Sequence, residues 1–286
     1  MTSLLRVEDL TVTFPKRGGG LVEAVRGISF SVGRERVGIV GESGSGKSMT
    51  GRAILRLVRP PGRAAARRID FDGIDLQSLS ERKMRGIRGQ RISMVMQDPK
   101  FSLNPVMSVG RQIAEAYRLH TGSAKGEAAA KTLEMLAAVQ IDDPERVAGL
   151  YPHEVSGGMG QRIMIAMMLA PDPDLLIADE PTSALDVTVQ RSVLAILDRL
   201  VRDRGMGLIL ISHDLNLVAS FCDRVIIMYA GRIVETCVAG ALDRAEHPYT
   251  QALLAALPRL SAPAERLAAM RRDPAWADAA SVDAHA

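Results

Sequence analysis

Cysteine and aromatic residues are scarce in this sequence. Its 286 residues include two cysteines, Cys222 and Cys237, and aromatic side chains make up 3% of the chain. Two cysteines without a Cys-x-x-Cys spacing argue against a disulfide framework and against a zinc site, and they fit a reducing compartment. Because bases bind by stacking on aromatic side chains, so few aromatic residues indicate neither a nucleic-acid partner nor a sugar-binding surface.

Long hydrophobic runs and a strong charge imbalance are also missing. The longest apolar run, IMIAMMLA at 163–170, is far shorter than the ~20 residues that span a bilayer. The first ten residues lack a basic segment followed by an apolar one, so we expect no signal peptide. The net charge is only +3, and the basic residues within 82–91 are interpreted as a solvated helix face. We therefore expect a cytoplasmic chain that does not cross a membrane and binds no nucleic acid.

Short apolar strands alternate with helical stretches along most of the chain. We expect strands at 4–14, 24–32, 36–40, 91–96, 174–179 and 207–212, and helices at 47–57, 126–139, 157–170, 187–203 and 214–221. Such alternation predicts an α/β fold with a mostly parallel sheet covered by helices on both faces. The first two strands, joined by a glycine-rich loop, are expected to form an antiparallel β-subdomain at the N-terminus.

Two regions depart from this alternation. Residues 98–172 contain several helical segments but no clear buried strand, so we interpret them as an inserted helical subdomain. After Leu257 the chain loses its apolar periodicity and becomes rich in alanine, proline and charge. That composition predicts a loosely ordered tail.

A phosphate-binding pattern lies between the strand at 36–40 and the following helix. Residues 41–48, GESGSGKS, match Gly-x-x-x-x-Gly-Lys-Ser, in which glycines let backbone N–H groups surround phosphate oxygens. Lys47 is expected to reach the terminal phosphates and Ser48 to bind Mg²⁺, which makes this a P-loop NTPase core. A glycine-rich turn without a ligand is the alternative, which the flanking strand and helix disfavour. The expected nucleotide contacts are Gly41, Glu42, Ser43, Gly44, Ser45, Gly46, Lys47, Ser48 and Met49.

A pair of acidic residues follows a second apolar strand, in LLIADEP at 175–181. Asp179 is expected at the carboxyl edge of the sheet, where open α/β sheets bind ligands, and would hold Mg²⁺ through water. Glu180 can orient and deprotonate the attacking water. The alternative is that both acids only stabilise the start of a helix.

A second anion site is indicated by EVSGGMGQR at 154–162. Ser156 is a natural N-cap, and Gly157 and Gly158 begin the long helix that follows. The exposed N–H groups of a helix N-terminus attract anions. The alternative is that this segment only caps its own helix.

Together these motifs resemble the ATP-binding cassette (ABC) superfamily. The phosphate loop, MVMQDP, SGG, LLIADE, SALD and LILISHD occur in the order of that family, within residues 1–257. The resemblance implies that Phe14 stacks on adenine, although it could be an ordinary strand aromatic. It further implies that Gln97 senses the γ-phosphate through Mg²⁺ and water, or is only a turn residue. His213 would contact the γ-phosphate and Glu180, or would cap the helix near Asp214.

Finer features resemble the peptide and nickel importer branch of the family. These are QDPKFSLNP at 97–105, YPHEVSGGMGQRIMIAMML at 151–169 and HPYTQALLAALP at 247–258. In that branch the last segment opens a C-terminal extension, so we divide the chain into an ATPase domain at 1–257 and an extension with its tail at 245–286. Some members hold an iron–sulfur cluster there, but this tail has no cysteine and none is expected.

The resemblance implies the ATPase subunit of a bacterial importer, bound to the cytoplasmic face of the inner membrane. Its cofactors would be ATP and Mg²⁺. Its partners would be two transmembrane subunits, a second ATPase chain in a head-to-tail dimer and, indirectly, an extracytoplasmic solute-binding protein. Ser156, Gly157 and Gly158 would contact the ATP of the other ATPase chain, and the surface at 98–120 would dock the membrane subunits.

Three questions remain open from the sequence. A soluble cassette ATPase that acts on ribosomes or nucleic acid is the alternative function, which the single cassette and the lack of sustained heptads disfavour. The transported solute contacts other subunits, so this sequence does not identify it. Di- or oligopeptides are the first candidates, followed by nickel, metal chelates and opine-like compounds. The second ATPase could be a copy of this chain or a related one.

Overall fold

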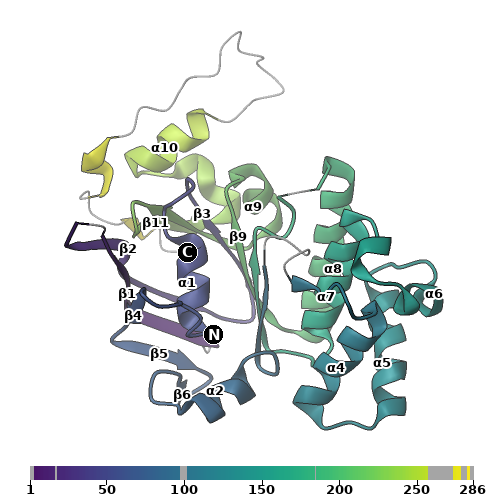
Figure 1. Cartoon of the computed structure of the whole chain (residues 1–286). Helices are drawn as coiled ribbons and strands as arrows, with labels where there is room; N and C mark the ends of the chain where they lie inside the picture. The colour runs from purple at the N-terminus through teal and green to yellow at the C-terminus, as the bar shows by residue number, and fades with distance from the viewer. Residues whose placement is uncertain are drawn as a thin grey trace. The chain divides into compact units, whose positions relative to one another are not determined.

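The computed structural model describes residues 3–16, 18–96, 102–183, 185–256, 273–277 and 282–283. They fall into two compact units, one formed by Met1–Gln77 with Ile209–Ala286 and the other by Ser78–Leu208. Figure 1 shows the elements of both units along the chain.

The first unit contains an antiparallel sheet built around one long strand. Its members are β1 (Leu5–Pro15), β2 (Leu21–Val32), β4 (Arg63–Ala65), β5 (Arg68–Phe71) and β6 (Ile74–Asp75). One edge of β1 pairs with β2, whereas β4 and β5 share the other edge, each along a different half of the strand. The N-terminal antiparallel β-subdomain predicted from the sequence is therefore present.

The same unit holds strands of a second, mixed sheet. In order they are β12 (Val282–Asp283), β11 (Arg232–Val238), β10 (Arg224–Tyr229), β3 (Arg36–Val40) and β9 (Gly207–Ser212). The pair β3 and β10 is parallel, and both strands are almost continuously buried, as parallel strands with covered faces are. The helical elements are α1 (Lys47–Ile54), α9 (Leu215–Phe221), η2 (Ala239–Arg244), α10 (Pro248–Ala255) and η3 (Pro274–Ala277).

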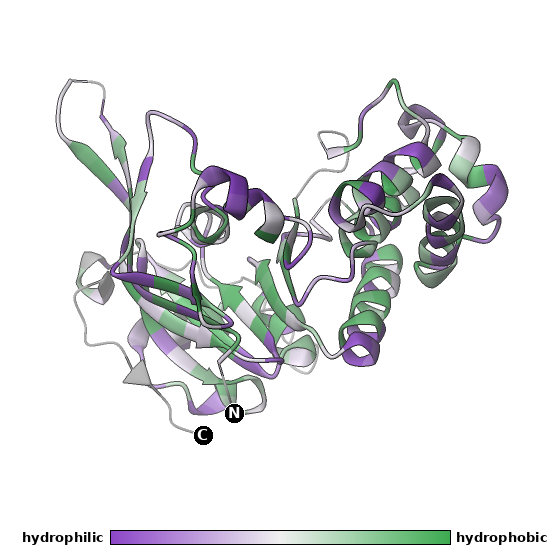
Figure 2. Ribbon diagram, turned by 90° about the horizontal axis from the view of Figure 1, so that it is seen from below, coloured by the Kyte–Doolittle hydropathy of each residue, from purple (hydrophilic) through white to green (hydrophobic). Residues whose placement is uncertain are grey.

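The second unit combines a parallel strand pair with a group of helices. The strands β7 (Ile92–Val95) and β8 (Leu175–Asp179) are parallel and buried. The helices are α2 (Glu81–Ile87), α4 (Val109–Thr121), α5 (Lys125–Ala138), α6 (Pro144–Gly149), η1 (Pro152–Glu154), α7 (Gly157–Leu169) and α8 (Val187–Arg204). Figure 2, coloured by hydropathy, shows both hydrophilic and hydrophobic residues on the helices. The helices α4 to α7 form the predicted helical insertion.

The sequence-based elements differ from the structure at several places. The helix expected at 47–57 ends at Ile54, because Arg56 adopts a left-handed backbone with φ 53°. The strands β10 and β11 are not predicted, nor are helices α4 and α10. The boundary placed at residue 257 falls where a stretch outside the described residues begins, and it stays a prediction. Among the described residues, no helix has the length and apolar character required to cross a membrane.

Candidate functional site

The phosphate loop occupies the turn between β3 and α1, in the first unit. Gly46 has φ 100°, and a Cβ atom there would lie 2.4 Å from the backbone oxygen of Ala24. At Gly41 a Cβ atom would lie 2.1 Å from the backbone oxygen of Met228 on β10. Glycine is therefore required at both positions, because the neighbouring backbone leaves no room for a side chain.

Lys47, the first residue of α1, turns its ammonium group back onto the loop. Its Nζ atom donates to the backbone oxygens of Gly41 and Glu42, each at 2.8 Å, and the side chain is 5% exposed. The cation is thus held inside the loop at the N-terminus of a helix, where the first N–H groups have no partner within the helix. Ser48 is the next residue and is half-buried. This arrangement suits an anion such as a nucleotide phosphate.

Two further predicted residues lie in the same unit as the phosphate loop. Phe14 is half-buried on β1, and its ring packs so closely on Gly62 that a Cβ there would lie 2.4 Å from the ring. His213 follows β9 and is exposed. The cap of α9 is Asp214, whose carboxylate accepts from the N–H of Leu217 at 3.1 Å. His213 is therefore not the helix cap, so this alternative role for it is wrong.

The acidic pair lies in the second unit, at the end of β8. Asp179 is the last residue of the strand and is 3% exposed. Glu180 has φ 48°, an uncommon backbone conformation for a residue other than glycine, and its carbonyl accepts from the N–H of Ser183 at 3.3 Å. Such strain is concentrated at functional sites in proteins, because the surrounding fold must hold it in place.

The SGG segment forms the N-terminus of α7, also in the second unit. Ser156 caps the helix by accepting from the N–H of Met159 at 3.3 Å, so the capping role is real. Ser156 and Gly157 are both exposed, and a Cβ at Gly157 would meet no atom within 4 Å. At Gly158 a Cβ would lie 2.8 Å from Val189 on α8, so this glycine permits close helix packing. Gly157 therefore has no packing role within its own unit.

The remaining predicted residue, Gln97, lies outside the described residues. The structure thus places the phosphate loop, Phe14 and His213 in one unit, and Asp179, Glu180 and the SGG segment in the other. Sequence analysis missed Tyr249, whose hydroxyl oxygen accepts from the backbone N–H of Glu42 in the loop at 3.1 Å. The HPYT motif, which contains Tyr249, marks this segment in the sequence. A motif does not show, however, which residue the tyrosine contacts in the folded chain.

Neither cysteine is suited to bind a metal ion. Burial raises the pKa of Cys222 to about 12 and that of Cys237 to about 11, so both thiols stay protonated at neutral pH. In the part of the chain that the structure describes, no group of three His, Cys, Asp or Glu side chains could hold a metal.

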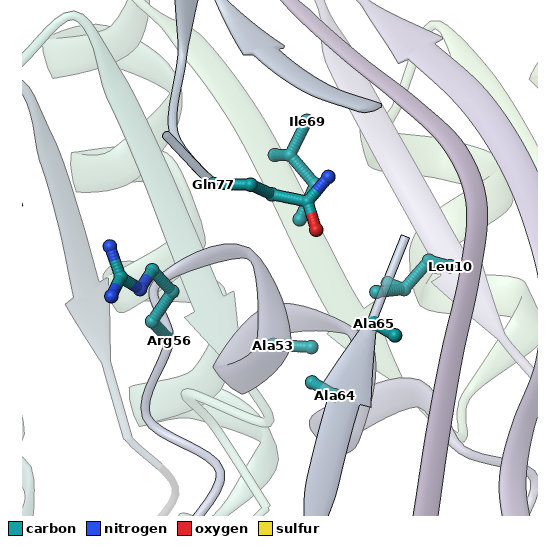
Figure 3. Close-up of a pocket in the computed structure, with 7 residues that line it drawn as sticks. All are labelled: Leu10, Ala53, Arg56, Ala64, Ala65, Ile69 and Gln77. Carbon is teal, nitrogen blue, oxygen red and sulfur yellow. The ribbon is translucent and has the colours of Figure 1, made fainter. Parts of the chain in front are cut away.

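A small open cavity of about 190 Å³ lies in the first unit, away from the phosphate loop. Figure 3 shows its lining, which is formed by Leu10, Ala53, Arg56, Ala64, Ala65, Ile69 and Gln77. It is smaller than the ~300 Å³ at which typical ligand pockets begin. The cavity is therefore no candidate for a nucleotide site.

Comparison with known proteins supports the interpretation of these motifs. Residues 25–183 match a family described as ABC transporter. The chain is 48% identical over 270 residues to the dipeptide transport ATP-binding protein DppD of Escherichia coli, covering 94% of this chain and 82% of that protein. It is 48% identical over 271 residues to the oligopeptide transport ATP-binding protein OppD of Bacillus subtilis, covering 93% and 75%.

A solved structure shares the fold. The dimeric post-hydrolysis state of the ATP-binding cassette MJ0796, bound to ADP and Pi, has a TM-score of 0.73 and 27% sequence identity. The similarity covers 82% of this chain and 98% of that one. The predicted α/β fold with a P-loop core is confirmed by this similarity.

Proposed function

This chain belongs to the ABC transporter family, as an ATP-hydrolysing subunit of the peptide-importer branch, and on that premise we propose that it energises uptake of di- or oligopeptides. The observation that carries the proposal is 48% identity, over 94% of the chain, to a protein named for dipeptide transport. The same identity to a protein named for oligopeptide transport supports it. Nickel and metal chelates are the second candidates.

In the proposed reaction a water oxygen attacks the γ-phosphorus of ATP, and the bond to the β-phosphate oxygen breaks. Glu180 takes the proton of that water as general base, and His213 contacts the γ-phosphate. Lys47 and the loop N–H groups bind the phosphates, and Phe14 stacks on the adenine. Ser48, Asp179 and Gln97 carry hydroxyl, carboxylate and amide oxygens, the hard donors that suit Mg²⁺, which would neutralise charge on the phosphate oxygens.

We further propose that the chain works in a complex at the cytoplasmic face of the membrane. A second ATPase subunit would complete each ATP site through Ser156, Gly157 and Gly158 of its own chain, in a head-to-tail dimer. Two transmembrane subunits would carry the solute, supplied by an extracytoplasmic binding protein. Support comes from the exposed SGG segment and from the dimeric cassette with the same fold.

Within the stretch 98–120, which we propose docks the membrane subunits, the apolar side chains differ in exposure. Leu103, an apolar residue of this stretch, is only 5% exposed and belongs to the core of the second unit, so it is not available to a partner. Val106 is 79% exposed, and exposed apolar residues can mark a partner site. Phe101 lies outside the described residues. Val106 is therefore the residue of choice for testing the contact.

Val106→Cys, labelled with benzophenone maleimide, should photocrosslink to a transmembrane subunit in inverted membrane vesicles that contain the assembled complex. The native cysteines are buried and protonated, so the label should attach to the new thiol alone. Leu21→Cys is the matched control, because Leu21 is a 66% exposed apolar residue on β2. Equal adduct yields at the two positions, or no membrane-protein adduct, would contradict docking at Val106 and favour a soluble ATPase.

Uptake of a radiolabelled dipeptide should depend on this chain. A deletion strain should recover uptake with the wild-type gene but not with Lys47→Ala, because the loop would lose its phosphate-binding cation. Unlabelled di- and tripeptides should compete for uptake, whereas Ni²⁺ should not. Competition by Ni²⁺ but not by peptides would contradict the peptide assignment. It would not contradict the assignment of the chain as an ATP-hydrolysing subunit.

A further inference from the structure

A tyrosine from the C-terminal part of the chain contacts the phosphate loop. Tyr249, on α10, is fully buried, and its hydroxyl oxygen accepts from the N–H of Glu42 at 3.1 Å across 207 residues of sequence. The start of α10 is fixed by His247, whose Nδ1 accepts from the N–H of Tyr249 at 3.1 Å. The hydroxyl of Tyr249 thus has a defined position next to the loop.

On the loop side, Glu42 is held at both of its backbone polar groups. Its N–H donates to Tyr249, and its carbonyl oxygen accepts from Lys47 Nζ at 2.8 Å and from the N–H of Ser45 at 3.2 Å. The preceding residue, Gly41, lies against the backbone of β10 at Met228. A movement of Glu42 would therefore displace a carbonyl that orients the phosphate-binding cation.

Two other aromatic side chains hold the ring of Tyr249. Its centroid lies 4.5 Å from that of Tyr229 and 5.6 Å from that of Trp276, and the latter two are 5.7 Å apart. The Tyr229 hydroxyl donates to the backbone oxygen of Asp273 at 3.3 Å. We call Tyr229, Tyr249 and Trp276 the aromatic cluster. It attaches the segment 273–277 to the same tyrosine that contacts the loop.

We propose that Tyr249 is a positioning residue for the phosphate loop, and that packing of Trp276 on its ring supports nucleotide affinity. The segment around Trp276 thereby becomes a C-terminal support of the nucleotide site. The inference rests on the proposed role of the loop in binding ATP. A tyrosine side chain has two main torsions, so loss of a packed neighbour frees its hydroxyl to move away from Glu42.

Tyr249→Phe keeps the ring and its packing but removes the acceptor of the Glu42 N–H. Loss of one neutral hydrogen bond corresponds to about a two- to tenfold change in an equilibrium constant. We expect the dissociation constant for the non-hydrolysable analogue AMP-PNP with Mg²⁺, measured by calorimetry on the full chain, to rise by that factor. Trp276→Ala should raise it similarly, and the double variant should show less than the product of the two effects, because both act through one hydroxyl.

The matched control is Tyr229→Phe. It removes a hydroxyl from the same aromatic cluster, together with the bond to Asp273, but it keeps the Tyr249 hydroxyl and the packing of the Tyr229 and Trp276 rings on Tyr249. If the cluster only anchors the C-terminal segment, Tyr229→Phe and Tyr249→Phe should affect melting temperature and nucleotide binding alike. The proposal expects comparable melting temperatures for these two variants, with a raised dissociation constant for Tyr249→Phe and an unchanged one for Tyr229→Phe.

Trp276 supplies a second readout, because it is the one tryptophan in the chain. AMP-PNP should change its fluorescence in the wild type and in Tyr229→Phe but not in Tyr249→Phe. An unchanged dissociation constant for Tyr249→Phe, or an equal rise for Tyr229→Phe, would overturn the inference while ATP binding by the wild type still stood. Failure of the wild-type chain to bind AMP-PNP would overturn the role of the loop and this inference with it.

Discussion

Glu180→Gln should lower ATP turnover by about 10²–10⁴-fold while ATP binding persists, the effect expected when a general base is lost. Glutamine has the shape of glutamate and tolerates the left-handed backbone at φ 48° no worse, so the fold around the site should be kept. The variant leaves the phosphate loop, the proposed ATP-binding segment, unchanged. Turnover should be measured in the assembled transporter. Binding should be measured as the amount of ATP that the protein retains under conditions that block hydrolysis.

The control for this variant is Glu134→Gln. It makes the same chemical change on α5, where the exposed Glu134 pairs with Lys131 at 2.8 Å, and Lys131 keeps Asp172 as a second partner. Turnover of Glu134→Gln should match the wild type. Hydrolysis by Glu180→Gln at an unaltered rate would show that another group is the base.

Mixed dimers should show that the SGG segment serves the ATP bound by the other subunit. One complete site should survive when Lys47→Ala in one subunit is paired with Gly157→Asp in its partner. When both changes are in one subunit and the other subunit is wild type, each ATP site should lack one of its two halves, either Lys47 or an intact SGG segment. The expected difference is ATP trapped in the first dimer and almost none in the second, because in the proposed dimer the loop and the SGG segment would bind opposite sides of the triphosphate.

The choice of Gly157 makes this test specific. A Cβ there meets no atom within 4 Å, so aspartate should leave the subunit itself folded and act only on what binds the helix N-terminus. Gly158 would be a poor choice, because its Cβ would collide with Val189. Differently tagged copies allow purification of each mixed dimer, and trapped ATP is counted per dimer. If the dimer with both changes in one subunit retained more ATP than the other dimer, the SGG segment would act on the ATP bound by the phosphate loop of its own chain.

Local signals in the sequence determined the chemistry of this protein. The strand–loop–helix around 41–48 was predictable because only glycines fit its turns and because lysine and serine follow at fixed positions. The bounds of β3 and β9 agree with prediction, since each is a short, continuous apolar run. The fold class followed from the same alternation. These features depend on residues within one or two elements of each other, so periodicity and spacing suffice to find them.

Tertiary structure decided the features that depend on distant residues. Leu103 is buried and Val106 is exposed, although both are apolar and lie close together in the sequence. The difference depends on which neighbouring elements cover each side chain. Likewise the close approach of Met228 to Gly41 and the bond from Glu42 to Tyr249 join residues far apart along the chain. Such contacts are set by strand order and helix packing, which sequence spacing does not encode. The motifs of the proposed site were therefore predictable from the sequence, whereas the contact between the phosphate loop and Tyr249 could be found only in the folded chain.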